Sequence, residues 1–134
     1  MATAPAQPAF DALGRERFVS LTTFRRSGEA VPTPVWVASD GTALVVTTPV
    51  GSGKVKRLRN DPRVRLVPCG RLGKVADGAV AVTGVAELVT EPAAVRRLTS
   101  LVRRKYRAEY LVVMALERLS RRGSERVVLR ITPA

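Results

Sequence analysis

Apolar residues alternate with polar or small residues in three successive runs in the first part of the chain. The runs cover residues 18–24, 30–39 and 42–48, and each is rich in valine, threonine or phenylalanine. This alternation and composition predict β-strands. Residues 25–29 and the pair Asp40-Gly41 separate the runs and have the composition of tight turns. The pattern therefore predicts an antiparallel hairpin followed by a third strand.

The second predicted strand carries two prolines, Pro32 and Pro34, directly before Val35 and Trp36. Proline has no amide donor, so this strand begins at an edge of the sheet or leaves backbone free to face something other than a neighbouring strand. Trp36 is the single tryptophan of the chain. It has two interpretations: an anchor in the core or in an interface, or part of the border of a site for a flat, polar ring.

A different pattern begins after residue 48. Ser52 stands at the start of a short cationic segment and can cap it as a helix, which Asp61-Pro62 ends. The later elements are expected as follows: strands over residues 63–69 and 79–90, a helix opened by Glu91-Pro92, a second helix over residues 109–121, a turn at residues 122–124 and a last strand over residues 125–132. The run 79–90 is apolar on both faces, as in a barrel strand that packs on the core inside and on a helix or a second subunit outside.

The two ends of the chain differ in composition. Residues 1–9 are rich in alanine and proline and predict a flexible arm, whereas residues 10–134 form a single domain that starts with a short helix over residues 10–17. Only one strand-to-strand link is clearly a helical crossover. A small antiparallel barrel of the α+β class, closed by one helical insertion, therefore explains the order of elements better than a parallel βαβ scheme.

Composition excludes several classes of function. Of the 134 residues 46% are hydrophobic, so the chain folds, but its apolar runs are too short to cross a bilayer and its start lacks the pattern of a signal peptide. A cytoplasmic protein without a membrane partner is expected. The chain has no histidine, which excludes Ser-His-Asp and Cys-His nucleophiles and the commonest zinc sites. Cys69 is the single cysteine, and a buried structural thiol is expected there.

The net charge of +12 is concentrated in one stretch. Residues 51–71 hold seven Lys or Arg against one Asp, which is half of that charge. Lys54 and Arg57 are three residues apart and lie on one face of the predicted helix, at an N-terminus whose free amides favour an anion. Arg65 on the next strand reaches the same anion or faces solvent. The stretch matches neither a Walker A loop nor a dinucleotide fingerprint, so it is either a phosphate site or a solvated basic helix.

Several of these segments together resemble a known family. They are residues 21–28, residues 31–37 with the sequence Val-Pro-Thr-Pro-Val-Trp-Val, Thr47-Thr48, residues 53–59 with the sequence Gly-Lys-Val-Lys-Arg-Leu-Arg, and residues 61–64. They resemble the pyridoxamine 5′-phosphate oxidase-like split barrels, and most of all the branch that uses the deazaflavin coenzyme F420. The resemblance extends over residues 10–132. It implies a six- to seven-stranded antiparallel split β-barrel with peripheral helices.

The resemblance also implies a homodimer with two cofactors in grooves between the subunits. It assigns Thr48, Ser52, Lys54 and Arg57 to the phosphate of the cofactor, Pro34, Val35 and Trp36 to the border of its ring, and Thr47 to a position beside the ring. The cofactor is coenzyme F420, with FMN as the alternative. Coenzyme F420 carries a phosphodiester and a tail of glutamates, so Lys56, Arg59 or the basic cluster at residues 103–105 could line a wider basic groove.

The function expected from this resemblance is that of an F420-dependent oxidoreductase, which transfers a hydride to a conjugated or quinone-like small organic substrate. The alternatives are an FMN- or haem-binding relative, a cofactor-storage protein and, because of the charge, a nucleic-acid-binding protein. Only six aromatic residues are present, which makes nucleic acid an unlikely partner. Tyr106 and Tyr110 are candidate proton donors for which roles in the core or an interface are expected, so no catalytic residue is assigned. The long strand apolar on both faces, together with Trp36, predicts the homodimer.

Overall fold

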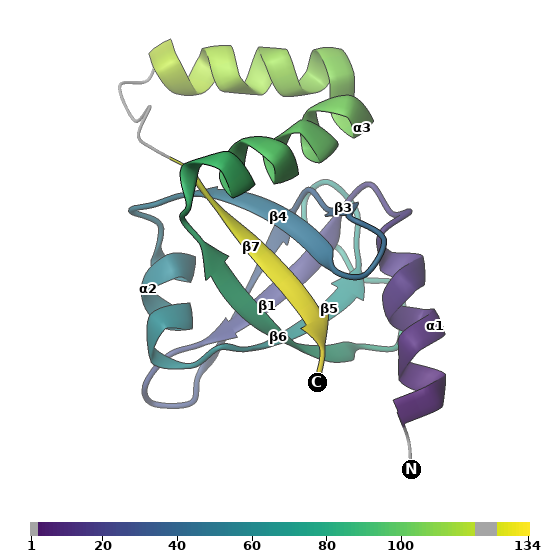
Figure 1. The fold of residues 1–134 in the computed structure, drawn as a ribbon. Coiled ribbons are helices and arrows are strands. Elements are labelled where there is room, and N and C mark those ends of the chain that lie inside the picture. Colours follow the sequence, from purple (N-terminus) through teal and green to yellow (C-terminus); the bar gives the residue numbers. More distant parts are fainter. Residues whose placement is uncertain (1–2, 120–125) are drawn as a thin grey trace.

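The computed structural model describes residues 3–119 and 126–134, and Figure 1 shows their arrangement. The elements in chain order are α1 (Thr3–Leu13), β1 (Val19–Phe24), β2 (Ala30–Val35), β3 (Ala38–Ser39), β4 (Leu44–Pro49), α2 (Gly53–Asn60), β5 (Arg63–Pro68), β6 (Val82–Val89), α3 (Pro92–Leu119) and β7 (Arg126–Pro133). The predicted strands and helices are confirmed in type and order. The turn predicted at residues 122–124 lies outside the described residues.

All strand pairs of the described chain are antiparallel and belong to one seven-stranded sheet with the order β2-β1-β5-β6-β7-β4-β3. The first and last strands of that order, β2 and β3, are separated in the chain by Trp36 and Val37 alone. The Cα atoms of Val35 and Ala38 are three residue steps apart and so lie at most about 11 Å from each other, whereas a flat sheet of this width measures roughly 29 Å from edge to edge. The sheet must therefore curl until its two edges meet, which gives the split barrel (Figure 1).

The inside of the barrel is filled from strands that are distant in sequence. Its fully buried side chains include Leu21, Leu44, Leu66, Leu129 and Ile131. Helix α1 closes one side of this core with Phe10 and Leu13, which are 1% and 3% exposed. A Cβ atom at Gly84 would lie 2.8 Å from the Thr132 carbonyl and 3.4 Å from the Phe10 ring, so only glycine allows this close approach.

Helix α1 differs from the flexible arm that the composition of residues 1–9 predicts. Residues 3–9 lie in this helix. Alanine has the highest helix propensity, and the burial of Phe10 and Leu13 attaches the last turns of α1 to β6 and β7. Tertiary contacts of these two side chains therefore outweigh the effect of Pro8, which lies inside the helix.

Helix α3 covers the outer face of β4 and β7 (Figure 1). It is broken at Arg107, where the backbone angles are φ 49° and ψ −120°. This gives two helical halves, as the spacing of residues 91–121 predicts. The first half buries Leu98, Val102 and Tyr106 against Val45 and Val128 of the sheet. The second half turns back over the first and lies farther from the sheet (Figure 1).

Within the single chain, the strands that are covered on both faces are β4 and β7. Strand β6 alternates between buried and exposed side chains, and Val85 on its outer face is 40% exposed. The outer face of β6 is thus partly exposed within the single chain, and the expectation that a second subunit covers it stays a prediction. In β4, by contrast, Leu44 and Val46 point into the barrel and Val45 points toward α3. Within the described residues, no helix is both long and apolar enough to span a membrane.

The predicted strand 30–39 is divided into β2 and β3 at Val37, and helix α3 supplies the missing hydrogen bonds. The Val37 amide donates to the Tyr106 hydroxyl at 3.0 Å, and the Val37 carbonyl accepts a hydrogen bond from Lys105 Nζ at 2.6 Å. Lys105 also donates to the carbonyls of Gly14 and Glu16. These bonds confirm that the chain after Pro34 is free to pair with something other than a strand, and they fix the position of Trp36.

Candidate functional site

A cavity of about 340 Å³ lies between the end of β4, the start of α2, the β2–β3 link and the second half of α3. Six of the eight residues that the family resemblance assigns to a cofactor line it together: Pro34, Val35, Trp36, Thr47, Thr48 and Lys54. Their positions in the chain fall into three separate segments. The curl of the sheet brings these segments together, because β2 leads directly into β3 and β3 pairs with β4.

Ser52 occupies the N-cap position of α2 but does not cap it with its side chain. Its hydroxyl lies 3.0 Å from the Thr48 hydroxyl at the edge of the cavity. The prediction of a side-chain cap is therefore wrong, since Thr48 at the end of β4 engages that hydroxyl. The first turn of α2 also contains no acidic residue. The positive end of the helix is thus left without a side-chain acceptor, which favours a bound anion.

Lys54 is the cation that α2 contributes to the cavity. Its side chain is half-buried, and within the described residues it has no ion-pair partner. Burial lowers the pKa of Lys54, and the positive charges of Arg57 and Arg126 lower it further. The ammonium group therefore lies in an unfavourable environment that an anionic ligand would improve.

Arg57 does not line this cavity. Its Nε donates to the Thr23 hydroxyl at 2.6 Å, and its guanidinium lies over Gly53, where a Cβ atom would be 2.7 Å from Nη1. Arg57 lines an adjacent basic hollow of about 600 Å³ together with Phe24, Arg25, Arg26, Gly53, Lys56 and Asn60. Burial and the charge of Arg25 lower the pKa of Arg57. Lys54 and Arg57 therefore lie in neighbouring hollows, although they share the start of one helix.

Trp36 forms a wall of the Lys54 cavity and is held by aromatic contacts. Its ring stacks on Tyr106 with centroids 4.5 Å apart and planes at 13°, and the ring of Tyr110 lies at 6.3 Å. Across the cavity, Arg71 lies over the Phe18 ring at 5.2 Å. Trp36 therefore packs within the chain, as its first interpretation predicts, and also lines the cavity, where its role toward a flat ring stays a prediction.

Three charged residues of the cavity were not singled out from the sequence: Arg71, Glu109 and Arg126. Glu109 forms ion pairs with Arg17 and Arg71. Arg126 donates to the carbonyl and hydroxyl of Thr47 at 3.1 and 3.2 Å and to Glu117 at 2.7 Å. The pairing of Arg126 with Pro49 across β7 and β4 explains this position. The only sequence signal is a cation at the start of the last predicted strand.

The remaining candidates lie away from the Lys54 cavity or are already bonded. Tyr106 is 3% exposed, burial raises its pKa, and its hydroxyl hydrogen-bonds to Val37 and Arg17. It therefore has no proton to offer a ligand. The Arg65 side chain is exposed and its guanidinium lies 5.5 Å from the Phe24 ring. Cys69 is half-buried rather than fully buried, because it follows the last residue of β5, and burial raises its pKa.

In the described part of the chain, no three His, Cys, Asp or Glu residues lie close enough together to bind a metal ion. The carboxylates near the cavity are instead paired with arginines, as Glu109 and Glu117 are. The cavity is therefore rich in cations and has an aromatic wall.

The sequence model of the family described as pyridoxamine 5′-phosphate oxidase matches residues 6–134. A search among curated proteins found no match. Among solved structures, a conserved hypothetical protein from Mycobacterium tuberculosis is 27% identical with a TM-score of 0.69, and the match covers 99% of this chain and 81% of that one.

Two further structures share the fold at lower identity. A protein described as an F420 reductase is 19% identical with a TM-score of 0.61, over 93% of both chains. The haem storage protein HutZ from Vibrio cholerae is 12% identical with a TM-score of 0.66, over 96% of this chain and 90% of that one. Identities this low establish a common fold, on which different ligands are used.

Proposed function

This chain belongs to the pyridoxamine 5′-phosphate oxidase family, and from that premise we propose that it is an oxidoreductase that binds coenzyme F420 in the Lys54 cavity and acts on a conjugated or quinone-like small molecule. The observation that carries the proposal is the half-buried Lys54 beside the uncapped start of α2, with like charges as its electrostatic neighbours. A phosphodiester would accept hydrogen bonds from the Lys54 ammonium group and from the free amides at the start of α2.

The residues present fit a phosphate group at the start of α2. Lys54 and Thr48 line the cavity, and the Ser52 hydroxyl at the start of α2 lies 3.0 Å from that of Thr48. A bound phosphate would also relieve the repulsion that lowers the Lys54 pKa. A phosphate group in this cavity would therefore have a cation and a hydroxyl group to bind.

The opposite wall of the cavity fits a flat ring. Pro34, Val35 and Trp36 border the space, and the stack of Trp36 on Tyr106 keeps that wall rigid. Thr47 lies beside it, with its carbonyl held by Arg126. When bound, the coenzyme would supply the hydride chemistry. The task of these residues would be to orient the ring and to exclude water.

The basic hollow around Arg57 supports coenzyme F420 over FMN. Arg25, Arg26, Lys56 and Arg57 line this hollow, and its lining contains no carboxylate. A glutamate tail would be attracted to such a surface, whereas FMN carries no tail. Of the basic cluster at residues 103–105, Lys105 is bonded to backbone carbonyls and would not contribute.

We further propose that the protein works as a homodimer, supported by the second half of α3. One face of this half-helix is apolar and exposed, with Leu111, Val112, Leu116 and Leu119 at 64%, 57%, 59% and 80% exposure. Trp36 is covered by Tyr106 of its own chain and gives no such support. Because Val113 and Met114 of the same half-helix line the Lys54 cavity, a second copy packed on α3 would lie next to the site.

Turnover separates the enzyme from a storage protein. Purified protein is mixed anaerobically with reduced coenzyme F420 and menadione as the quinone, and oxidation of the coenzyme is followed by its absorbance. The proposal expects oxidation that depends on protein, on quinone and on Lys54. If the coenzyme binds tightly but is not oxidised with menadione or with any of a panel of conjugated ketones as the hydride acceptor, the result would favour a cofactor-storage protein. The haem alternative lacks a histidine for an axial ligand.

A further inference from the structure

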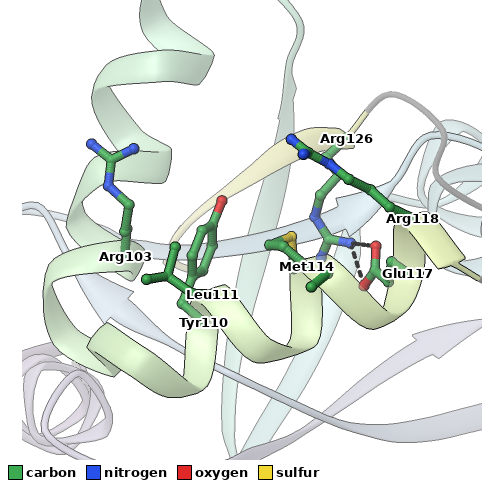
Figure 2. Close-up of a pocket in the computed structure, with 8 residues that line it drawn as sticks. Arg103, Tyr110, Leu111, Met114, Glu117, Arg118 and Arg126 are labelled. Carbon is green, nitrogen blue, oxygen red and sulfur yellow. Dashed lines mark hydrogen bonds and ion pairs between the residues drawn. The ribbon is translucent and has the colours of Figure 1, made fainter.

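A second cavity, of about 500 Å³, lies at the elbow between the two halves of α3 and the first residue of β7 (Figure 2). We call it the elbow cavity, and its lining residues are Arg103, Tyr110, Leu111, Met114, Ala115, Glu117, Arg118 and Arg126. The break at Arg107 creates it, because a continuous helix would keep Arg103 and Arg118 on separate turns about 22 Å apart along the axis. The fold thus gathers cations from three segments at one cavity.

The charges of the elbow cavity are not balanced. Arg126 is paired with Glu117 through two hydrogen bonds from Nη1, at 2.7 and 2.9 Å. Arg103 and Arg118 have no ion-pair partner among the described residues, and their guanidinium groups lie on either side of Tyr110 in Figure 2. Two positive groups, one on each side of Tyr110, therefore border the cavity, and no residue of the described chain neutralises them.

The rest of the lining is apolar or adaptable. Leu111, Met114 and Ala115 and the ring of Tyr110 provide hydrocarbon surface. The Tyr110 hydroxyl points away from its own helix in Figure 2 and has no hydrogen-bond partner within the described residues. Methionine fits ligands of irregular shape. This combination suits a molecule with an apolar body and an anionic end, since Arg binds carboxylates in a planar, two-pronged geometry.

We propose that the elbow cavity binds an organic carboxylate with an apolar body, which the positive charges of Arg103 and Arg118 attract to the cavity. Met114 and Arg126 line both this cavity and the Lys54 cavity, so the two spaces adjoin. A ligand anchored in the elbow would extend toward the proposed ring of the cofactor. Its use as the substrate rests on the proposed function, but binding of the carboxylate does not.

The test measures binding of 4-phenylbutyrate and of its neutral analogue 4-phenylbutan-1-ol by calorimetry, with the full chain and without cofactor. The variants are Arg103→Met and Arg118→Met, and the matched control is Arg104→Met. Arg104 is exposed, directly follows Arg103 and lines neither cavity. All three variants remove one charge from an exposed position, so each is expected to fold.

The expected result is that the carboxylate binds and the alcohol binds at least about 10-fold more weakly. Arg103→Met and Arg118→Met should each lower the affinity for the carboxylate by about 3- to 10-fold, a range set by the exposure of both arginines. Arg104→Met should change this affinity less than about 2-fold. Equal binding of acid and alcohol, or an equal loss in Arg104→Met, would overturn the proposal. Lys54→Met separates the two sites: it should leave phenylbutyrate binding intact, and loss of binding in that variant would assign the anion to the Lys54 cavity instead.

Discussion

The hydroxyl of Tyr106 accepts a hydrogen bond from the backbone amide of Val37 at 3.0 Å, across 69 positions of sequence. Val37 is the residue at which the edge strands β2 and β3 meet, and Trp36 beside it stacks on the same tyrosine ring. One side chain of α3 therefore closes the barrel and holds the aromatic wall of the candidate site. The closure of the barrel and the shape of the candidate site therefore depend on the same residue.

Tyr106→Phe should separate these two contributions. The variant keeps the ring under Trp36 but leaves the buried Val37 amide without its acceptor, which costs about 1–3 kcal/mol of stability. Chemical denaturation measures this loss, and tryptophan fluorescence of the native state should stay close to that of the parent. Tyr110→Phe is the control, expected within about 0.5 kcal/mol, because the Tyr110 hydroxyl has no partner among the described residues. Equal effects of the two variants would contradict this role of Tyr106.

Asp40 should make stability depend on acid pH. Burial raises its pKa, but hydrogen bonds from the Thr42 and Ala43 amides, from Arg130 and from the Thr42 hydroxyl outweigh burial and lower the pKa from 3.8 to about 2. A lowered pKa stabilises the fold above pH 3.8, and this contribution of about 2 kcal/mol is lost as the pH falls through about 2. Denaturant unfolding measured at several pH values between about 5 and about 2 checks this loss of stability. Asp40→Asn should make the free energy of unfolding depend less steeply on pH in this window. An unchanged dependence would count against this role of Asp40.

Lys54→Met should lower the affinity for the cofactor without lowering the stability of the fold. The variant removes a half-buried charge whose electrostatic neighbours are Arg57 and Arg126, so the stability of the protein without ligand should stay equal or rise. Affinity for the phosphate-bearing cofactor should fall by about 10- to 150-fold. Fluorescence titration and thermal unfolding of the same sample measure both. Arg59→Met, exposed on the same helix and outside both hollows, should change neither.

Leu116→Lys should convert the proposed dimer into a monomer. Leu116 is 59% exposed on the apolar face of α3, where a second copy would bury it. Sedimentation at micromolar concentration should give a dimer for the parent and the mass of 14.5 kDa for the variant. Leu72→Lys, at a loop position 93% exposed, should stay dimeric. A monomeric parent with a folded spectrum would reject the dimer.

Local chemistry made much of this fold predictable. The prolines of β2 predicted an edge position or a stretch of free backbone, and β2 is an edge strand of the described sheet. Asp40-Gly41 predicted a turn, and Gly41 adopts the φ of +100° that suits glycine. The position of a short basic helix between β4 and β5 followed from Ser52 and Asp61-Pro62.

Side-chain destinations that depend on distant partners could not be predicted. Arg57 is turned away from Lys54 by Thr23, 34 positions earlier in the chain. Arg126 reaches the cavity because β7 pairs with β4, and its hydrogen bonds to Thr47 span 79 positions. The elbow cavity depends on the backbone of Arg107, a non-glycine residue with positive φ. Spacing within one segment carries no information about such contacts.

The central claim is that coenzyme F420 binds with its phosphate at Lys54 and its tail in the hollow of Arg57. Fluorescence titration of coenzyme F420 and FMN, each at low and high salt, tests it most directly. The claim predicts tighter binding of coenzyme F420, a preference that shrinks as salt screens the exposed tail contacts over about 8 Å, and an Arg57→Met variant that loses affinity for coenzyme F420 but not for FMN. Tighter binding of FMN, a preference indifferent to salt, or salt-dependent binding of DNA with neither cofactor bound would contradict it.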